Sequence, residues 1–185
     1  MKTYILIYDD FVQFEVIIAS YFMKTKGEIV TVGLTNEKVS SFEEFITLPH
    51  MTIDEIDIND VDVFIIPGGN PKKLKCTKFY KLLKDLNKKT IPIAAICSAP
   101  IHLARSGVLK GKNYTTTLPI DEYKLFEKEY FKNKNVVVDK NIITAKASGY
   151  VDFAIEIGKV MNIFENEEDL EETIRYFKRF DEYEG

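Results

Sequence analysis

The feature that most constrains this 185-residue chain is a short apolar run that ends in a cysteine. Residues 91–96 read Ile-Pro-Ile-Ala-Ala-Ile, and Cys97 follows with Ser-Ala-Pro and then a helical pattern of apolar residues. An apolar run of this length is typical of a buried strand. Small residues beside the cysteine suit the tight turn of a strand–nucleophile–helix elbow. The sequence therefore predicts that Cys97 stands at the tip of an elbow, where a helix N-terminus favours thiolate over thiol.

Strand-like and helix-like segments alternate along the chain. Strands are predicted over residues 2–8, 28–35, 61–66, 91–96, 114–117, 136–139 and 142–145. Helices are predicted over residues 10–24, 71–89, 101–108, 120–131 and 150–161, and from Asn166 onward. Residues 36–57 suggest a short hairpin at the sheet edge. The pattern predicts an α/β protein with a doubly wound, flavodoxin-like three-layer sandwich, whose mostly parallel sheet carries helices on both faces.

Composition and charge narrow the class of function. The chain is 45% hydrophobic and 29% charged, with a net charge of -4, and its length suits a single domain over residues 1–185. Nucleic-acid binding is not expected because it uses a basic face. No apolar stretch approaches the ~20 residues of a membrane span, and the first ten residues lack the features of a signal peptide. We expect a cytoplasmic protein whose partner is a small-molecule substrate or oxidant, with no cofactor and no metal.

Glu15 departs from the pattern of the first predicted helix. Asp10 and Gln13 resemble a capping box at the start of this helix. The apolar residues that recur at helical spacing are Phe11, Phe14, Ile18, Tyr21 and Phe22. At ~100° per residue Glu15 falls in the middle of this stripe. Glu15 is either a partly exposed carboxylate at the edge of the stripe or a buried, protonated carboxyl that donates a hydrogen bond to a Cys97 thiolate, and we favour the second.

The carboxyl ends of the strands are where ligands bind in sheets of this kind. Glu15, Gly68 and Gly69, and Cys97 all follow strands and are expected at that edge. The amides of Gly69 and Ser98 could converge there as an oxyanion hole, although a simple turn is the better explanation of the two glycines on spacing alone.

The remaining reactive side chains have weaker contexts. Cys76 has no elbow around it, and His50 lies in the ambiguous edge segment. His102 points roughly 140° away from Cys97 on the same helix, so it is a poor general base for that thiol. The last helix carries an apolar stripe ending at Phe177, which could cover the core or meet a partner.

Three motifs together resemble the DJ-1/ThiJ/PfpI superfamily, within the class I glutamine amidotransferase-like fold. They are Phe14-Glu15, residues 63–70 ending in Pro-Gly-Gly-Asn, and Ala-Ala-Ile-Cys-Ser-Ala-Pro around Cys97, and the likeness runs along essentially the whole chain. The resemblance implies a homodimer. It also implies one of several activities: glutathione-independent glyoxalases, proposed deglycases, chaperone-like stress proteins, redox sensors and proteases.

The resemblance also assigns roles to individual residues. Cys97 would be the reactive cysteine and Glu15 its protonated partner, with backbone donors from Gly69 and Ser98. Three further residues are expected in the pocket: Gly68, Asn70 and Thr117.

One departure from the family limits the chemistry. Thr117 stands where many members carry a histidine beside the cysteine, and residues 147–152 lack the His-x-Glu of amidotransferases. Protease and amidotransferase activities are therefore less expected. The leading hypothesis is that the Cys97 thiolate attacks a small reactive carbonyl while Glu15 moves the proton. The alternative is a non-enzymatic redox-sensing or chaperone-like stress protein that uses the same oxidisable cysteine. Both hypotheses need a low thiol pKa.

Overall fold

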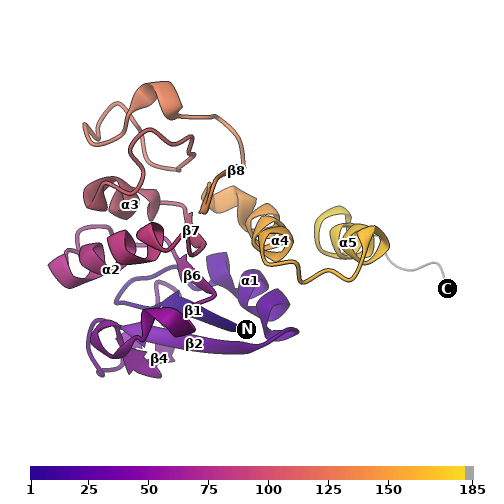
Figure 1. Ribbon diagram of the computed structural model, residues 1–185, viewed down its shortest axis with the longest axis horizontal. Coiled ribbons are helices and arrows are strands. Elements are labelled where there is room, and N and C mark those ends of the chain that lie inside the picture. The colour runs from indigo at the N-terminus through magenta and orange to yellow at the C-terminus, as the bar shows by residue number, and fades with distance from the viewer. Residues whose placement is uncertain (182–185) are drawn as a thin grey trace.

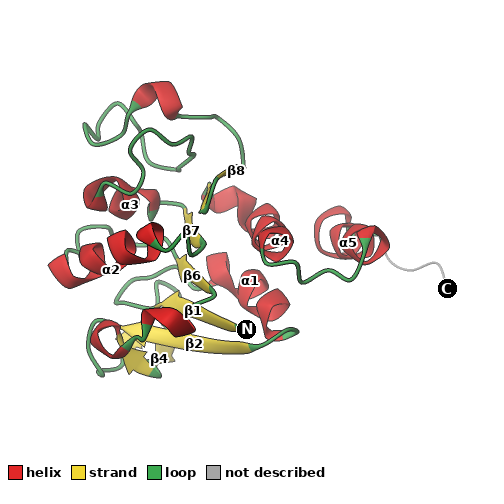
Figure 2. Cartoon of the chain, in the orientation of Figure 1, coloured by secondary structure: helices red, strands yellow, loops and turns green. Residues whose placement is uncertain are grey.

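The computed structural model describes residues 1–181, which are organised around a seven-stranded sheet (Figures 1 and 2). The strand order is β5-β2-β1-β6-β7-β9-β8. The strands are β1 (Lys2–Leu6), β2 (Glu28–Gly33), β5 (Met51–Thr52), β6 (Val63–Ile66), β7 (Ile93–Ile96), β8 (Val136–Asp139) and β9 (Ile142–Ala145). Every neighbouring pair is parallel except β8 and β9, which form an antiparallel hairpin. The predicted doubly wound, mostly parallel sheet is confirmed.

Helices cover both faces of the sheet (Figure 1). One layer holds α2 (Thr77–Lys88) and α3 (Pro100–Ser106), and the other holds α1 (Phe14–Lys24) and α4 (Tyr150–Val160). Strand β6 shows why its sequence is apolar throughout. Phe64 packs into the α2–α3 layer and Ile65 into the α1–α4 layer, and both are fully buried. Successive side chains of a strand point to opposite faces, so a strand covered on both sides has no polar face.

The C-terminal helix lies outside these layers. Helix α5 (Glu167–Ile174) begins after Asn166, whose side chain accepts a hydrogen bond from the Asp169 amide at 3.0 Å, and it continues into a π-helical turn, Arg175–Arg179. The ring of Phe177 packs edge-on against Phe22 of α1, with centroids 4.9 Å apart. The last apolar stripe therefore packs against the core cluster of the α1–α4 layer.

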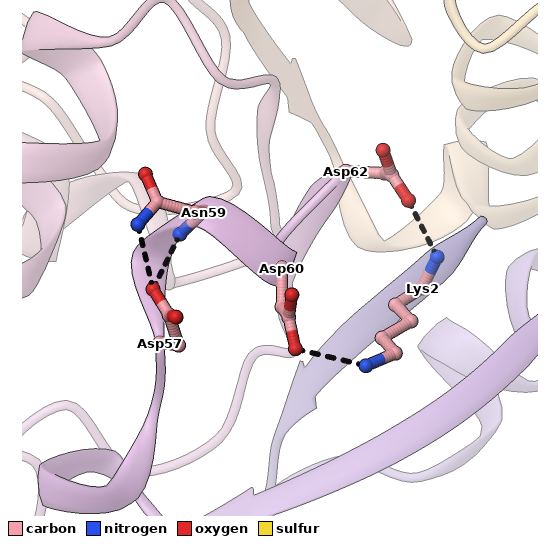
Figure 3. Close-up of polar contacts among 5 residues, drawn as sticks. All are labelled: Lys2, Asp57, Asn59, Asp60 and Asp62. Atoms are coloured by element: carbon pink, nitrogen blue, oxygen red, sulfur yellow. Dashed lines mark hydrogen bonds and ion pairs between the residues drawn. The ribbon is translucent and has the colours of Figure 1, made fainter.

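A polar clip ties the amino ends of two neighbouring strands, at the sheet edge opposite the expected site (Figure 3). The backbone amide of Lys2 donates to the Asp62 carboxylate at 2.6 Å, and its ammonium pairs with Asp60 at 2.9 Å. Asp57 accepts hydrogen bonds from Asn59 in the preceding 3-10 turn. The clip fixes where β1 and β6 begin, although exposed ion pairs of this kind contribute only about 0–1 kcal/mol.

Residues 114–131 differ from the prediction. The predicted helix over residues 120–131 is wrong, since this segment is a loop with one 3-10 turn, Lys128–Tyr130. It wraps around Tyr114, which stacks on Phe126 at 5.2 Å. The predicted strand over residues 114–117 is reduced to one bridge, between Tyr114 and Phe131. A side-chain hydrogen bond is found there in place of backbone bonds between strands. The Thr115 hydroxyl donates to the Lys134 carbonyl at 2.8 Å.

The start of α1 also differs from the prediction. No capping box forms at Asp10, which has a positive φ of 64°. The amides of Gln13 and Phe14 donate instead to the carboxylate of Glu43, each at 3.0 Å. Glu43 lies in the turn of a two-stranded ribbon formed by β3 (Val39–Ser40) and β4 (Ile46–Thr47). The expected hairpin is therefore present, and it supplies the cap of α1 from a distant part of the chain.

The buried face of α1 and the start of α2 also differ from the prediction. Phe14 and Tyr21 are 48% and 61% exposed, so the apolar stripe of α1 is not the one expected. The buried face consists of Glu15, Val16, Ala19, Phe22 and Met23. Helix α2 begins six residues later than predicted, because the side chain of Asn70 accepts a hydrogen bond from the Lys72 amide at 3.1 Å and holds a turn.

Candidate active site

Cys97 follows β7 directly, and its backbone has a left-handed φ of 62°. A non-glycine residue in this region costs about 1–3 kcal/mol and persists only where its surroundings hold it. Three hydrogen bonds do so. The Cys97 amide donates to the Ala145 carbonyl at 2.9 Å, and the Cys97 carbonyl accepts from the Thr116 hydroxyl at 2.8 Å and the Thr117 amide at 3.0 Å. The predicted elbow is present, and the backbone beneath the thiol is clamped on both sides.

Glu15 is 2% exposed, and its carboxyl lies beside the Cys97 thiol, so that each group shifts the pKa of the other. The backbone amide of Gly68 donates to Oε2 of Glu15 at 2.8 Å. The side chain therefore points from the buried face of α1 to the elbow, as the sequence predicts. Its place on the helix explains this, since residues 15, 19 and 22 share the face that packs toward the sheet.

The two acidic groups control each other's protonation. Burial raises the pKa of the Glu15 carboxyl above its ordinary value. Burial, and then the neighbouring Glu15 carboxylate, raise the pKa of the Cys97 thiol to about 12. Two buried acids in contact do not both ionise at neutral pH, so the pair holds one proton and one negative charge. This direction is opposite to the low thiol pKa that both sequence hypotheses need, because burial of the sulfur outweighs the donors around it. A thiolate forms at neutral pH only when Glu15 keeps the proton of the pair.

The raised pKa of Glu15 makes stability depend on pH. Because the folded protein holds this proton more tightly than the unfolded chain, the free energy of unfolding falls as pH rises above the ordinary carboxyl value of 4.5 and through the folded pKa. We expect Glu15→Gln to remove this fall, so that the variant gains stability relative to wild type at pH 8 compared with pH 4. Urea unfolding at the two pH values measures the difference. An equal effect of the substitution at both would contradict it.

The two glycines are required by close approach. A Cβ atom on Gly68 would lie 2.6 Å from Cys97 Cβ and 2.6 Å from Glu15 Oε2. Gly69 has a φ of 141°, and a Cβ there would lie 2.3 Å from the Asp10 carbonyl oxygen. The simple-turn interpretation is therefore incomplete, because the turn is pressed against both members of the pair.

The expected oxyanion donors are arranged differently from one another. The amide of Ser98 lies beside the Cys97 sulfur and lowers the pKa of the thiol. The amide of Gly69, in contrast, donates to the Ser98 hydroxyl at 3.1 Å, and that hydroxyl donates to the Gly69 carbonyl at 2.9 Å. In this structure only the Ser98 amide faces the reactive atom, and a role for Gly69 as a donor requires its bond to Ser98 to open.

Thr117 and Asn70, both expected in the pocket, have different roles in the structure. The hydroxyl of Thr117 accepts a hydrogen bond from the Ala147 amide at 2.9 Å, and it lies close enough to the Cys97 sulfur to lower the pKa of the thiol. Thr117 is exposed, so it stands at the mouth of the site. Asn70 is exposed as well, but its side-chain oxygen bonds the Lys72 amide and completes the glycine turn. The structure brings Thr117 to the sulfur and leaves Asn70 as a turn residue.

The other reactive side chains lie elsewhere. His102 is fully buried beside Phe79 and Tyr80, and burial lowers its pKa to about 3. Within residues 1–181 neither of its ring nitrogens has a hydrogen-bond partner. His50 is bonded to Thr31 at the surface. Cys76 precedes α2 and packs against the α2–α3 layer.

One contributor to the site was missed from the sequence. Tyr8 follows β1 and is 3% exposed, and its hydroxyl donates to the Gly68 carbonyl at 2.9 Å. A tyrosine that closes an apolar strand at the carboxyl edge of a sheet is the available signal, because a buried phenol needs a hydrogen-bond partner.

Two absences concern the described part of the chain. Residues 1–181 contain no group of three or more His, Cys, Asp or Glu side chains placed to hold a metal ion. The helices of this region include none that is both long and apolar enough to cross a bilayer.

Fold and site together define an α/β protein with a nucleophile elbow, whose cysteine is paired with a buried carboxyl. The model of the DJ-1/PfpI family matches residues 1–159, and the chain belongs to that family. The predicted superfamily is thereby confirmed.

Relatives and solved structures agree with this assignment. The chain is 29% identical to the deglycase TK1284 of Thermococcus kodakarensis over 153 residues, which is 80% of this chain and 92% of the relative. It is also 29% identical to the uncharacterized protease YoaZ of Bacillus subtilis over 143 residues, covering 74% of this chain and 68% of the relative. The crystal structure of the DJ-1 superfamily protein Atu0886 from Agrobacterium tumefaciens matches with a TM-score of 0.86 at 25% identity, over 98% of this chain and 100% of that chain.

Proposed function

We propose that this protein converts small reactive carbonyl compounds through Cys97, as a glyoxalase- or deglycase-like enzyme of stress protection. The observation that carries the proposal is the buried Glu15 carboxyl placed beside the Cys97 thiol at a strained elbow. The deglycase name of one relative supports the same class of substrate. The two free cysteines suit the cytoplasm, where disulfides are rare, and we place the protein there.

The pair can supply each proton movement of such a reaction. The Cys97 thiolate adds to an aldehyde carbon and forms a C–S bond, and the carbonyl oxygen takes the proton held by Glu15. Glu15, now a carboxylate, removes the proton from the same carbon of a 2-oxoaldehyde and returns it to the neighbouring carbon, while the hydroxyl proton of the attacked carbon passes to the neighbouring oxygen. The resulting thioester is cleaved by water, which releases a 2-hydroxy acid and restores the thiol. The Ser98 amide stabilises negative charge that develops at the sulfur end of the site.

Methylglyoxal turnover tests the proposal. We expect purified wild-type protein to consume methylglyoxal and form lactate, and Cys97→Ala to lose this activity, while Cys76→Ala retains it. Cys76 is the matched control because it is the other free cysteine of the chain and lies outside the site. Consumption by Cys97→Ala at the wild-type rate would sink the proposal.

Redox sensing, or a chaperone-like role controlled by the same thiol, is the second candidate. It is favoured by the hydrogen-bond donors at the sulfur, namely the Ser98 amide and the Thr117 hydroxyl. Such donors stabilise oxygen-bearing, negatively charged states of the sulfur as well as a thiolate. Peroxide would transfer oxygen to the Cys97 thiolate and leave as water. Peptide mass analysis after mild peroxide should find oxygen at Cys97 before Cys76, and the reverse order would count against this role.

We also propose that the protein forms a homodimer through the face that joins α1 to the β3–β4 ribbon. Its exposed apolar side chains are Phe14, Ile17, Tyr21, Phe42, Phe45, Ile46 and Leu48. The two parts are tied together, because Glu43 bonds the first amides of α1 and the Phe42 amide donates to the Phe11 carbonyl at 2.8 Å. An apolar patch of this kind is typical of an interaction surface. A twofold dimer would cover the same patch on both copies.

A charge on this face should break the dimer. We expect Ile46→Glu to elute as a monomer in size-exclusion chromatography with light scattering, since Ile46 is 66% exposed at the centre of the ribbon. Leu125→Glu is the control, because Leu125 is 55% exposed in the loop after α3, away from the ribbon. The assignment of the interface fails if both variants keep the wild-type mass.

A further inference from the structure

Tyr8 makes contacts that the proposed chemistry does not yet use. Its hydroxyl oxygen lies 2.9 Å from the Gly68 carbonyl oxygen and 3.3 Å from the Pro67 carbonyl oxygen. Burial raises the pKa of the Tyr8 phenol well above its ordinary value, and the nearby Glu15, Cys97 and Asp10 act in the same direction. The phenol therefore keeps its proton, and it acts as a donor to these two carbonyls.

The two peptide groups whose carbonyls lie beside Tyr8 also carry the amides that bond Glu15 and Ser98. In a trans peptide the carbonyl and the next amide hydrogen point in opposite directions. The peptide of the Pro67 carbonyl carries the Gly68 amide, which donates to Glu15 at 2.8 Å. The peptide of the Gly68 carbonyl carries the Gly69 amide, which donates to the Ser98 hydroxyl at 3.1 Å. Tyr8 therefore holds the carbonyl ends of both peptides whose amide ends meet Glu15 and Ser98.

We propose that Tyr8 is a positioning residue, whose hydroxyl sets how the single proton is divided between Glu15 and Cys97. The inference rests on the site described for the proposed function, and it adds a residue that acts through the peptide between Pro67 and Gly68, whose carbonyl oxygen lies 3.3 Å from the Tyr8 hydroxyl oxygen. A hydrogen bond to a carbonyl polarises its peptide and strengthens the amide donor at the other end. The Gly68 amide stabilises the Glu15 carboxylate, which is the state with the proton on sulfur. Loss of the Tyr8 hydroxyl should therefore move the proton toward Glu15 and increase the thiolate population.

Alkylation of Cys97 measures that division directly. We expect Tyr8→Phe to raise the rate of Cys97 alkylation by iodoacetamide at pH 7 by about 2- to 4-fold, because a charge-assisted hydrogen bond is weakened and not abolished. Phenylalanine keeps the buried ring, so the variant should retain its fold. Tyr4→Phe is the matched control, since it removes the hydroxyl of another buried tyrosine, on β1 four residues before Tyr8, and this variant should alkylate at the wild-type rate.

A double-mutant cycle separates positioning from a structural effect. In the Glu15→Gln background there is no shared proton to divide, so adding Tyr8→Phe should leave the alkylation rate unchanged. A rise of about 2- to 4-fold that persists in that background would overturn the inference. An unchanged or slower alkylation rate of Tyr8→Phe alone would overturn it as well. Alkylation needs no turnover. Failure of the methylglyoxal assay would therefore remove the proposed function while leaving the cycle to decide the role of Tyr8.

Discussion

Replacing Glu15 with glutamine is expected to lower methylglyoxal turnover by about 10²–10⁴-fold, the range lost when a positioned acid or base is removed. Thr117 cannot take over, because an aliphatic hydroxyl is a far weaker acid than a carboxyl and its oxygen already accepts from the Ala147 amide. Glutamine keeps the shape of the side chain and can still accept from the Gly68 amide, so the loss reports proton transfer and not packing.

The pH profile of alkylation should change in shape as well. In wild type the pair has one proton to share, so the Cys97 thiolate fraction stays nearly constant until the second proton leaves near pH 12. In Glu15→Gln the thiol titrates alone, and its rate should rise about tenfold per pH unit below its pKa. Glu156→Gln is the control, because its carboxylate pairs with Lys159 on α4 and is not among the groups that shift the pKa of Glu15 or Cys97. A wild-type profile with one ordinary thiol pKa of about 8.5 would remove the basis of both proposed functions.

Gly68→Ala should damage both stability and the site. The added Cβ would lie 2.6 Å from Cys97 Cβ, 2.6 Å from Glu15 Oε2 and 3.0 Å from the Cys97 sulfur. Neither neighbour can retreat cheaply, since Cys97 is clamped at the elbow and Glu15 is buried. Overpacking of this kind costs about 1–3 kcal/mol. We expect a lower midpoint in urea unfolding together with an altered alkylation rate at Cys97.

Gly111→Ala separates the clash from the general cost of losing a glycine. Gly111 has a positive φ of 66°, and a Cβ there meets nothing within 4 Å. Its substitution should cost about 1–2 kcal/mol through the backbone alone and leave Cys97 alkylation unchanged. If Gly68→Ala is no more destabilising than Gly111→Ala, the claim that Cys97 and Glu15 leave no room for a Cβ atom at Gly68 is wrong.

The parts of the fold that could be predicted are those written in local patterns. The apolar run before Cys97 and the small residues after it specify an elbow from ten consecutive residues, and β7 and α3 lie where that pattern places them. Glu15 was found from helical periodicity, although Phe14 and Tyr21 of the expected stripe are exposed. The angular position of Glu15 on the helix follows from its residue number alone. Its burial is therefore predicted correctly even though two of the expected stripe residues are exposed.

The parts that could not be predicted depend on contacts between distant segments. Glu43 caps α1 from a ribbon about thirty residues later, and no local signal distinguishes it from other acids of that region. The loop over residues 120–131 has helical spacing, but its apolar side chains are used to enclose Tyr114. Tyr8 contributes through carbonyls some sixty positions away, and that pairing follows from the parallel neighbours β1 and β6.

The three hydrogen bonds around the Cys97 backbone have a consequence for substrate size. Hydrogen bonds to Ala145, Thr116 and Thr117 fix the Cys97 backbone. The elbow therefore cannot move away from the substrate to make room for a larger adduct. The opposite wall consists of residues 8–12 and 67–70, which are joined by the bridge between Phe11 and Gly69 and by loop hydrogen bonds. Room for a bulkier ligand must come from this wall. Changes in these two loops are therefore expected to alter which carbonyls enter, whereas changes beneath the cysteine alter whether the thiol is presented at all.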